Sequence, residues 1–79
     1  MRALPKLPVV SGAKTVKALQ LAGFVRVRQA GSHVTMRHHD TRRSATVPLH
    51  GSQDLPPGTL RSILRQAALS VDEFRDLLK

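Results

Sequence analysis

A histidine inside a very basic segment is the first residue of this chain whose type and setting suggest chemistry. His33 follows a Gly-Ser pair in the stretch RQAGSHVTMR, from Arg28 to Arg37, and it begins a run in which apolar and polar residues alternate. Imidazole gains and loses a proton near neutral pH, so it can act as a general acid or base. His33 is therefore a candidate for proton transfer, a candidate metal ligand or a plain strand residue.

Cleavage of RNA is the reaction that these side chains could perform together. RNA carries its own nucleophile, the 2′-hydroxyl, so a protein must supply a base, an acid for the departing 5′-oxygen and positive charge for the phosphate. His33 is the candidate catalytic residue, and His50 is a possible second proton-transfer group. DNA has no 2′-hydroxyl and could not be cleaved in this way. Candidate phosphate-binding residues are Arg26, Arg28 and Arg37.

The same residues also have plainer interpretations. A histidine on an exposed, basic strand can be a solvated residue or a simple phosphate contact, because clustered titratable groups only sometimes mark catalysis. Ser32 is typical of a turn, although its hydroxyl could donate to a phosphate. Lys14 and Lys17 could form a solvated helix face or extend an RNA-binding surface. A metal site on His33 and His50 is disfavoured, because no carboxylate is near and the surroundings are positive, so we expect no metal or other cofactor.

The overall charge favours a phosphate-rich partner. The chain has 13 Lys and Arg against 5 Asp and Glu, a formal net charge of +8, and no acidic residue precedes Asp40. Such a field attracts nucleic acid through counterion release, and an acidic protein or an anionic membrane surface is the alternative. The 2 aromatic residues, Phe24 and Phe74, are too few for a module that reads single strands by base stacking.

Length and cysteine content limit the architecture and the compartment. A chain of 79 residues is expected to form one domain, 1–79, with a small core and an extended lead-in over residues 1–10. It contains no cysteine, so disulfides are excluded and the chain would tolerate a reducing cytosol. No apolar run is long enough for a signal-peptide core or a membrane span. We therefore expect a cytoplasmic protein.

Hydrophobic periodicity predicts a helix, three antiparallel strands and two further helices. Ser11 is a suitable N-cap for a first helix that ends at Gly23. Period-2 alternation in FVRVRQ, HVTMRHH and SATVPLH predicts a three-stranded meander. Pro57 can begin the second helix, and the Ser70 and Glu73 pair predicts a capping box for a short terminal helix. The expected class is α+β, with the helices on one face of the sheet.

Loop lengths would set the register of this sheet. Four-residue hairpin loops at 29–32 and 40–43 would place every apolar strand residue opposite another apolar residue. The predicted pairs are Val25 with Met36, Val27 with Val34, Val34 with Leu49, and Met36 with Val47.

The opposite face of the predicted sheet would be basic, polar and open to solvent. In this register Arg28 and His50 would flank His33 on the two neighbouring strands. The predicted open face carries Arg26, Arg28, His33, Thr35, Arg37, Thr46, Pro48 and His50.

Several short motifs between about Leu7 and Leu78 resemble those of one protein family. They are LPVVSG, KAL with AGF at the end of the first helix, RQAGSH, the hairpin tip RHHDTRR, TVPLHG, and LPPGTLRSILRQAALS followed by EF. Together they are similar to the HicA (YcfA-like) toxins of bacterial type II toxin–antitoxin systems. The resemblance implies a double-stranded-RNA-binding-domain-like fold.

The resemblance also implies a function. It implies that His33, the histidine of the GSH motif, is the catalytic residue of an endoribonuclease that cleaves mRNA without the ribosome. It further implies a cognate HicB-type antitoxin that binds the basic face and covers His33. RNA and this antitoxin are the expected partners, with no membrane and with DNA only through the antitoxin, if at all. The alternative from a different class is a non-catalytic double-stranded-RNA-binding module that uses the same basic residues.

Overall fold

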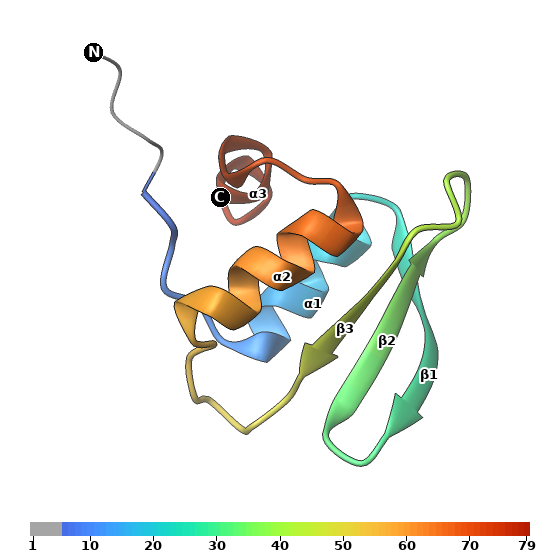
Figure 1. The fold of residues 1–79 in the computed structure, drawn as a ribbon, viewed down its shortest axis with the longest axis horizontal. Helices are drawn as coiled ribbons and strands as arrows, with labels where there is room; N and C mark the ends of the chain where they lie inside the picture. The colour runs from blue at the N-terminus through green and yellow to red at the C-terminus, as the bar shows by residue number, and fades with distance from the viewer. Residues whose placement is uncertain (1–5) are drawn as a thin grey trace.

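A computed structural model describes residues 6–79, which fold into an α+β arrangement of helices around one antiparallel sheet (Figure 1). The three strands lie in the order β1-β2-β3, so β2 is central. This order of elements confirms the predicted fold class. Residues 6–10 of the predicted lead-in contain no helix or strand, and 1–5 lie outside the described residues. The elements are α1 (Gly12–Leu21), β1 (Phe24–Ala30), β2 (His33–His38), β3 (Ser44–Pro48), α2 (Pro57–Ala67) and α3 (Val71–Leu77).

The helices begin where their capping residues predict. The Ser11 hydroxyl accepts a hydrogen bond from the Lys14 backbone N–H and so caps α1. In α3, Ser70 and Glu73 form both hydrogen bonds of the predicted capping box. The backbone N–H of Ser70, and then its hydroxyl, hold the pKa of Glu73 below its ordinary value. Among residues 6–79, no helix combines the length and apolar character needed to cross a membrane.

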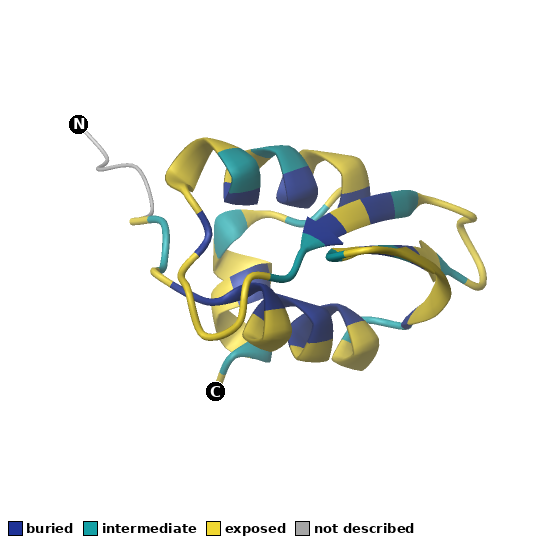
Figure 2. Ribbon diagram, turned by 90° about the horizontal axis from the view of Figure 1, so that it is seen from below, coloured by how far each residue is buried: buried dark blue, intermediate teal, exposed yellow. Residues whose placement is uncertain are grey.

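One face of the sheet forms the core with the helices. Alternate residues of β2 and β3 are completely buried. Figure 2 shows the buried segments of helices and strands turned toward one another. These strand residues pack with buried side chains of α2 and with Phe74 of α3. The buried strand residues are Val34, Met36, Ala45 and Val47.

The first hairpin departs from the predicted register. Its loop has two residues, Gly31 and Ser32, because Ala30 pairs directly with His33. Gly31 has a φ of 58°, which suits the first position of a two-residue hairpin turn and favours glycine there. A β-bulge at Val27 then shifts the register, so Arg26 pairs with Met36. The predicted pairs of Val25 and Val27 with the middle strand are therefore wrong, and Arg26 lies on the helix side of the sheet.

The bulge has a physical reason in the packing of Phe24. Without it, the two-residue turn would set Val27 opposite Met36 and Val25 opposite His38, with Phe24 on the solvent side. With it, Phe24 is only 3% exposed and packs edge-on against His38, with ring centroids 5.2 Å apart. The bulge thus buries the larger aromatic side chain and leaves Val25 and Val27 at 50% and 46% exposed.

The second hairpin also differs from the predicted register, but its apolar residues stay on the predicted face of the sheet. The backbone N–H of His38 donates to the Arg43 carbonyl, and the N–H of Arg42 donates to the His38 carbonyl. These bonds close a loop over 39–42, one position earlier than predicted. The His38 imidazole accepts from the backbone N–H groups of Asp40 and Thr41, which fixes this loop. Val34 consequently pairs with Val47 instead of Leu49, and Met36 with Ala45 instead of Val47. A shift of two residues preserves side-chain direction, so the apolar residues remain inward.

The two edge strands of the sheet, β1 and β3, differ in how their outer edges are covered. At the β3 edge, the backbone N–H of Thr46 donates to the side chain of Gln66 at 3.3 Å, so α2 covers the edge (Figure 1). Ser62 accepts a hydrogen bond from the Gln66 amide at 3.0 Å and orients it. The β1 edge instead carries the bulge and the exposed valines. The last turn of α2 is thereby held beside the middle of β3.

Candidate functional site

His33 is the first residue of β2 and lies on the sheet face that the helices leave open. The tight turn at Gly31 ends directly before it, so the imidazole is set at a strand end instead of in a mobile loop. Its direct neighbours across the sheet are Ala30 on β1 and Pro48 on β3. The prediction that Arg28 and His50 flank it as cross-strand partners is therefore wrong, because both hairpins have shifted register.

His50 nevertheless comes close to His33 from the segment that follows β3. The two ring centroids are 6.4 Å apart, and the ring planes are nearly perpendicular at 86°. The backbone carbonyl of His50 accepts a hydrogen bond from the Gln53 backbone N–H at 3.1 Å. This bond closes a turn in which Gly51 has a φ of 60°. Both imidazoles belong to exposed residues. The structure thus brings together the two histidines that the sequence singled out, although not through strand pairing.

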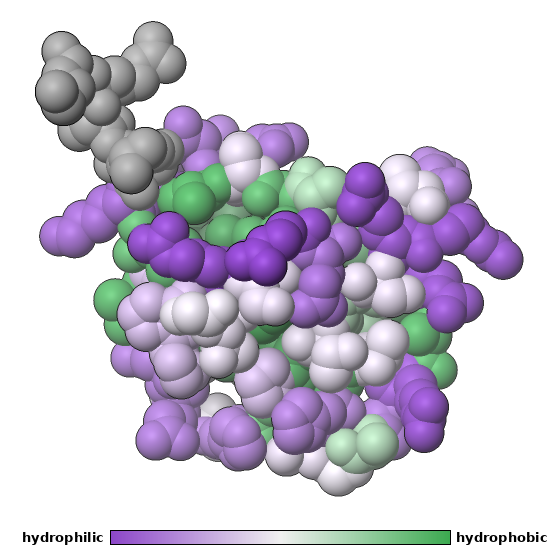
Figure 3. All heavy atoms as spheres, in the orientation of Figure 1, coloured by the Kyte–Doolittle hydropathy of each residue, from purple (hydrophilic) through white to green (hydrophobic). Residues whose placement is uncertain are grey.

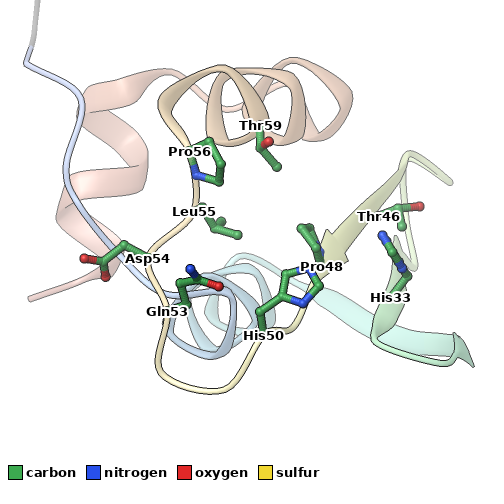
Figure 4. Close-up of a pocket in the computed structure, with 9 residues that line it drawn as sticks. All are labelled: His33, Thr46, Pro48, His50, Gln53, Asp54, Leu55, Pro56 and Thr59. Carbon is green, nitrogen blue, oxygen red and sulfur yellow. The ribbon is translucent and has the colours of Figure 1, made fainter.

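The histidines lie in a groove of about 480 Å³ between the end of β3 and the start of α2 (Figure 4). Pro56 and Thr59 lie on the α2 side, and Pro48 and His50 on the other, with Leu55 between them. The carboxyl group of Asp54 points away from both imidazoles in Figure 4. The groove is lined by His33, Thr46, Pro48, His50, Gln53, Asp54, Leu55, Pro56 and Thr59.

Close backbone contacts hold the walls of this groove in place. The N–H of Leu55 donates to the Val10 carbonyl at 2.8 Å, and Ser11 forms an isolated bridge with Asp54. Gly12 lies against the carbonyl of Pro48, and a Cβ there would be 2.2 Å from that oxygen. Only glycine permits this approach of α1 to the end of β3. The Ser11-Gly12 pair therefore both caps a helix and positions the groove.

The open face next to the groove is positively charged. Arg28 pairs with Thr35, and Arg37 pairs with Ser44, whose hydroxyl accepts from the Arg37 guanidinium at 3.3 Å. Both arginines share the face of His33, as predicted. Arg26 does not, since it pairs with Met36 on the helix side. The three paired strands present no acidic residue on this open face, so His33 lies in a field that attracts phosphate.

Further charge gathers at the tip of the second hairpin. Arg42 and Arg43 are exposed there, and Figure 3 shows hydrophilic residues collected around this end of the molecule. His39 and Asp40 form an ion pair at 2.8 Å in the same loop. Such an exposed pair contributes little to stability. The tip extends the basic surface away from the helices.

The lysines of α1 lie elsewhere. Lys14 and Lys17 line a separate groove of about 380 Å³ between α1 and α3, together with the exposed Leu21 and with Leu77 and Leu78. They share no lining residue with the histidine groove. An RNA-binding role for these lysines would therefore require RNA to pass around the helices.

Sequence reasoning missed the residues that complete the histidine groove. No site role is predicted from the sequence for Gln53, Leu55, Pro56 or Thr59, yet all four line the groove together with the histidines. Their proximity to His33 depends on how α2 packs beside β3, which no local pattern encodes. Among residues 6–79, no three His, Cys, Asp or Glu side chains are grouped as metal ligands would be.

Comparison with models of known protein families finds a match that covers the site described above. A family model described as the HicA toxin of bacterial toxin–antitoxin systems matches residues 12–69. The chain belongs to this toxin family. The match extends from the start of α1 past the end of α2, and it includes His33, His50 and the whole groove. Membership in the HicA family implies an antitoxin as a partner. A comparison with individual curated proteins finds no match.

Proposed function

We propose that this HicA-family chain is a metal-independent endoribonuclease that cleaves mRNA, with His33 transferring a proton. The observation that carries the proposal is the exposed His33 imidazole at a strand end, 6.4 Å from the His50 ring and beside a basic sheet face. The neighbouring arginines provide the positive charge that a phosphodiester needs. Membership in a toxin family supplies a biological reason for such an activity.

The reaction uses the nucleophile that RNA carries. One imidazole takes the proton of the 2′-hydroxyl as its oxygen attacks the adjacent phosphorus. The bond from phosphorus to the 5′-oxygen then breaks, and that oxygen receives a proton from the second, protonated imidazole. The products are a 2′,3′-cyclic phosphate and a free 5′-hydroxyl. We assign these two proton transfers to His33 and His50, whose ring separation leaves room for one phosphodiester between them.

The arginines on the open face stabilise the phosphate during this reaction. Negative charge on the non-bridging oxygens increases in the transition state, so fixed donors aimed at them lower the barrier. Arg28 and Arg37 lie on the same face as His33, and Ser44 restrains Arg37. The Ser32 hydroxyl, in the turn directly before His33, is a further donor in this proposal.

We further propose that a HicB-type antitoxin inhibits the chain by covering His33. The open face is exposed and basic, so a partner with an acidic surface would bind it favourably and would compete with RNA. A partner of this kind needs no chemical change in the toxin. Its removal would leave the histidine groove accessible at once.

The test is cleavage of a long single-stranded RNA in EDTA. Wild-type protein, His33→Ala and His39→Ala are compared after their circular dichroism spectra are matched. His39 is the control because it is another exposed histidine, paired with Asp40 outside the groove. We expect cleavage by wild type and His39→Ala, with 2′,3′-cyclic phosphate or 3′-phosphate ends, and none by His33→Ala. Salt-dependent binding without cleavage by any of the three would instead identify an RNA-binding module.

A further inference from the structure

The histidine groove and the basic face differ in charge. Among residues 6–79, no lysine or arginine lines the groove, and the one carboxyl group that does so points away from the imidazoles (Figure 4). The guanidinium groups of Arg28 and Arg37 lie instead on the neighbouring open face of the sheet. The open face and the His33 end of the groove therefore suit a phosphate, whereas the rest of the groove suits a neutral group attached to it.

The walls of the groove are suitable for a flat, partly apolar ring. Pro48 and His50 form one side, Pro56 forms part of the other, and Leu55 lies between them (Figure 4). Small-molecule sites typically combine apolar walls with a few polar groups. The volume of about 480 Å³ is within the range of such sites.

Two neutral polar side chains can read the edge of a base in this groove. The Gln53 backbone is fixed by its hydrogen bond to His50, while its side-chain amide offers both a donor and an acceptor. Thr59 is half-buried in the first turn of α2 and adds a hydroxyl from the opposite wall. Bases differ in the order of donors and acceptors along their edges, so these groups can distinguish them.

We propose that this groove binds the nucleobase next to the cleaved phosphate and that Gln53 and Thr59 determine which base is accepted. This inference rests on the proposed RNA cleavage and adds a specificity site to it. His33 lies at one end of the groove, so a base held between its walls places the attached ribose phosphate beside the imidazole. Gln53 and Thr59 are specificity-determining residues in this account and take no part in proton transfer.

The first experiment maps cleavage sites in a long RNA of mixed sequence. Wild type, Gln53→Ala, Thr59→Val and Gln20→Ala are compared by the base found on each side of the cut. Gln20 is the matched control because it is an exposed glutamine on α1, outside the groove. We expect wild type and Gln20→Ala to share a base preference on one side. Each groove variant should reduce that preference by about 3- to 10-fold while continuing to cleave, as expected for one lost hydrogen bond.

The outcomes separate this inference from the proposed function. Cleavage without a base preference at either side, or a preference that both groove variants retain, would overturn the nucleobase site and leave the endonuclease intact. If wild type does not cleave, the endonuclease is overturned, and titration with the four nucleoside 3′-monophosphates decides the site by itself. NMR shifts of the Gln53 amide and His50 ring that differ among the four nucleotides would support the site. Equal or absent shifts would overturn it.

Discussion

The two faces of β2 have opposite roles although their residues alternate along one strand. Val34 and Met36 are completely buried against the helices, whereas His33 and Arg37 are exposed on the open face. A buried apolar side chain stabilises the fold through the area it removes from water and through close packing. An exposed polar side chain contributes little to folding and is free to meet a ligand. Stability and activity should therefore respond to different substitutions within six consecutive residues.

The largest expected effect is on catalysis, from the open face. His33→Ala should reduce the RNA cleavage rate by about 10²- to 10⁴-fold, the usual contribution of a proton-transfer group. Its free energy of unfolding should change by less than about 0.5 kcal/mol, because the removed ring is exposed. Rate measurements and urea unfolding on the same preparation test both parts. A variant that lost activity only because it had unfolded would contradict the separation of the two faces.

The largest expected loss of stability comes from the buried face. Met36 is 0% exposed, so Met36→Ala should lower the free energy of unfolding by about 2–5 kcal/mol through lost burial and a new cavity. Thr35→Ala, one residue away on the open face, is the control and should change it by less than about 1 kcal/mol. Urea unfolding curves provide the comparison. Similar losses in the two variants would show that the faces do not differ.

Substitution of Gly12 should affect stability and cleavage together, because Gly12 packs α1 against β3 and also positions the histidine groove. Gly12→Ala would bring a Cβ to 2.2 Å from the Pro48 carbonyl, so α1 and the end of β3 must move apart. We expect a loss of about 1–3 kcal/mol in stability, typical of overpacking, together with slower cleavage from a displaced groove wall. Gly58→Ala is the control, since a Cβ there meets nothing within 4 Å. Full activity in a destabilised Gly12→Ala protein would show that Pro48 does not position the site.

The smallest effect should come from the α3 cap, whose residues do not line the histidine groove. Ser70→Ala removes one hydrogen bond of the capping box and should cost about 0.5–2 kcal/mol without changing cleavage. The cap also gives a pH dependence, because the pKa of Glu73 is lower in the folded chain than in the unfolded chain. Its contribution is present above the unfolded-state pKa and is lost as the pH falls through the lower folded-state pKa. Wild type and Glu73→Gln, compared by thermal unfolding across that acidic range, should converge as the carboxyl becomes protonated.

Local signals predicted the elements well because their causes are local. The hydroxyls of Ser11 and Ser70 cap the first backbone N–H groups of the helix that each precedes, and Pro57 begins α2 where its missing donor is not needed. The alternation of β2 correctly placed Val34 and Met36 inward, with His33 outward. These features depend on residues within about one helical turn or one strand, so a sequence pattern contains them.

The prediction of the strand register was wrong for a different reason. A choice between four- and two-residue loops cannot be made from the Gly31 turn alone, and the bulge at Val27 depends on burying Phe24 against His38. That contact joins the start of β1 to the end of β2. Only the sum of these packing energies selects the register, and it moved Arg26 away from the predicted open face.

The sequence by itself determined the α+β order of elements, the positive charge and the placement of His33 directly after a turn. These follow from periodicity, capping and composition, which act over short distances along the chain. Only the tertiary structure decided that His50 approaches His33 and that the beginning of α2 forms the opposite wall of their groove. The physical reason is that α2 is held against the β3 edge by Gln66 and by burial of its apolar side, while Gly12 permits close contact at Pro48.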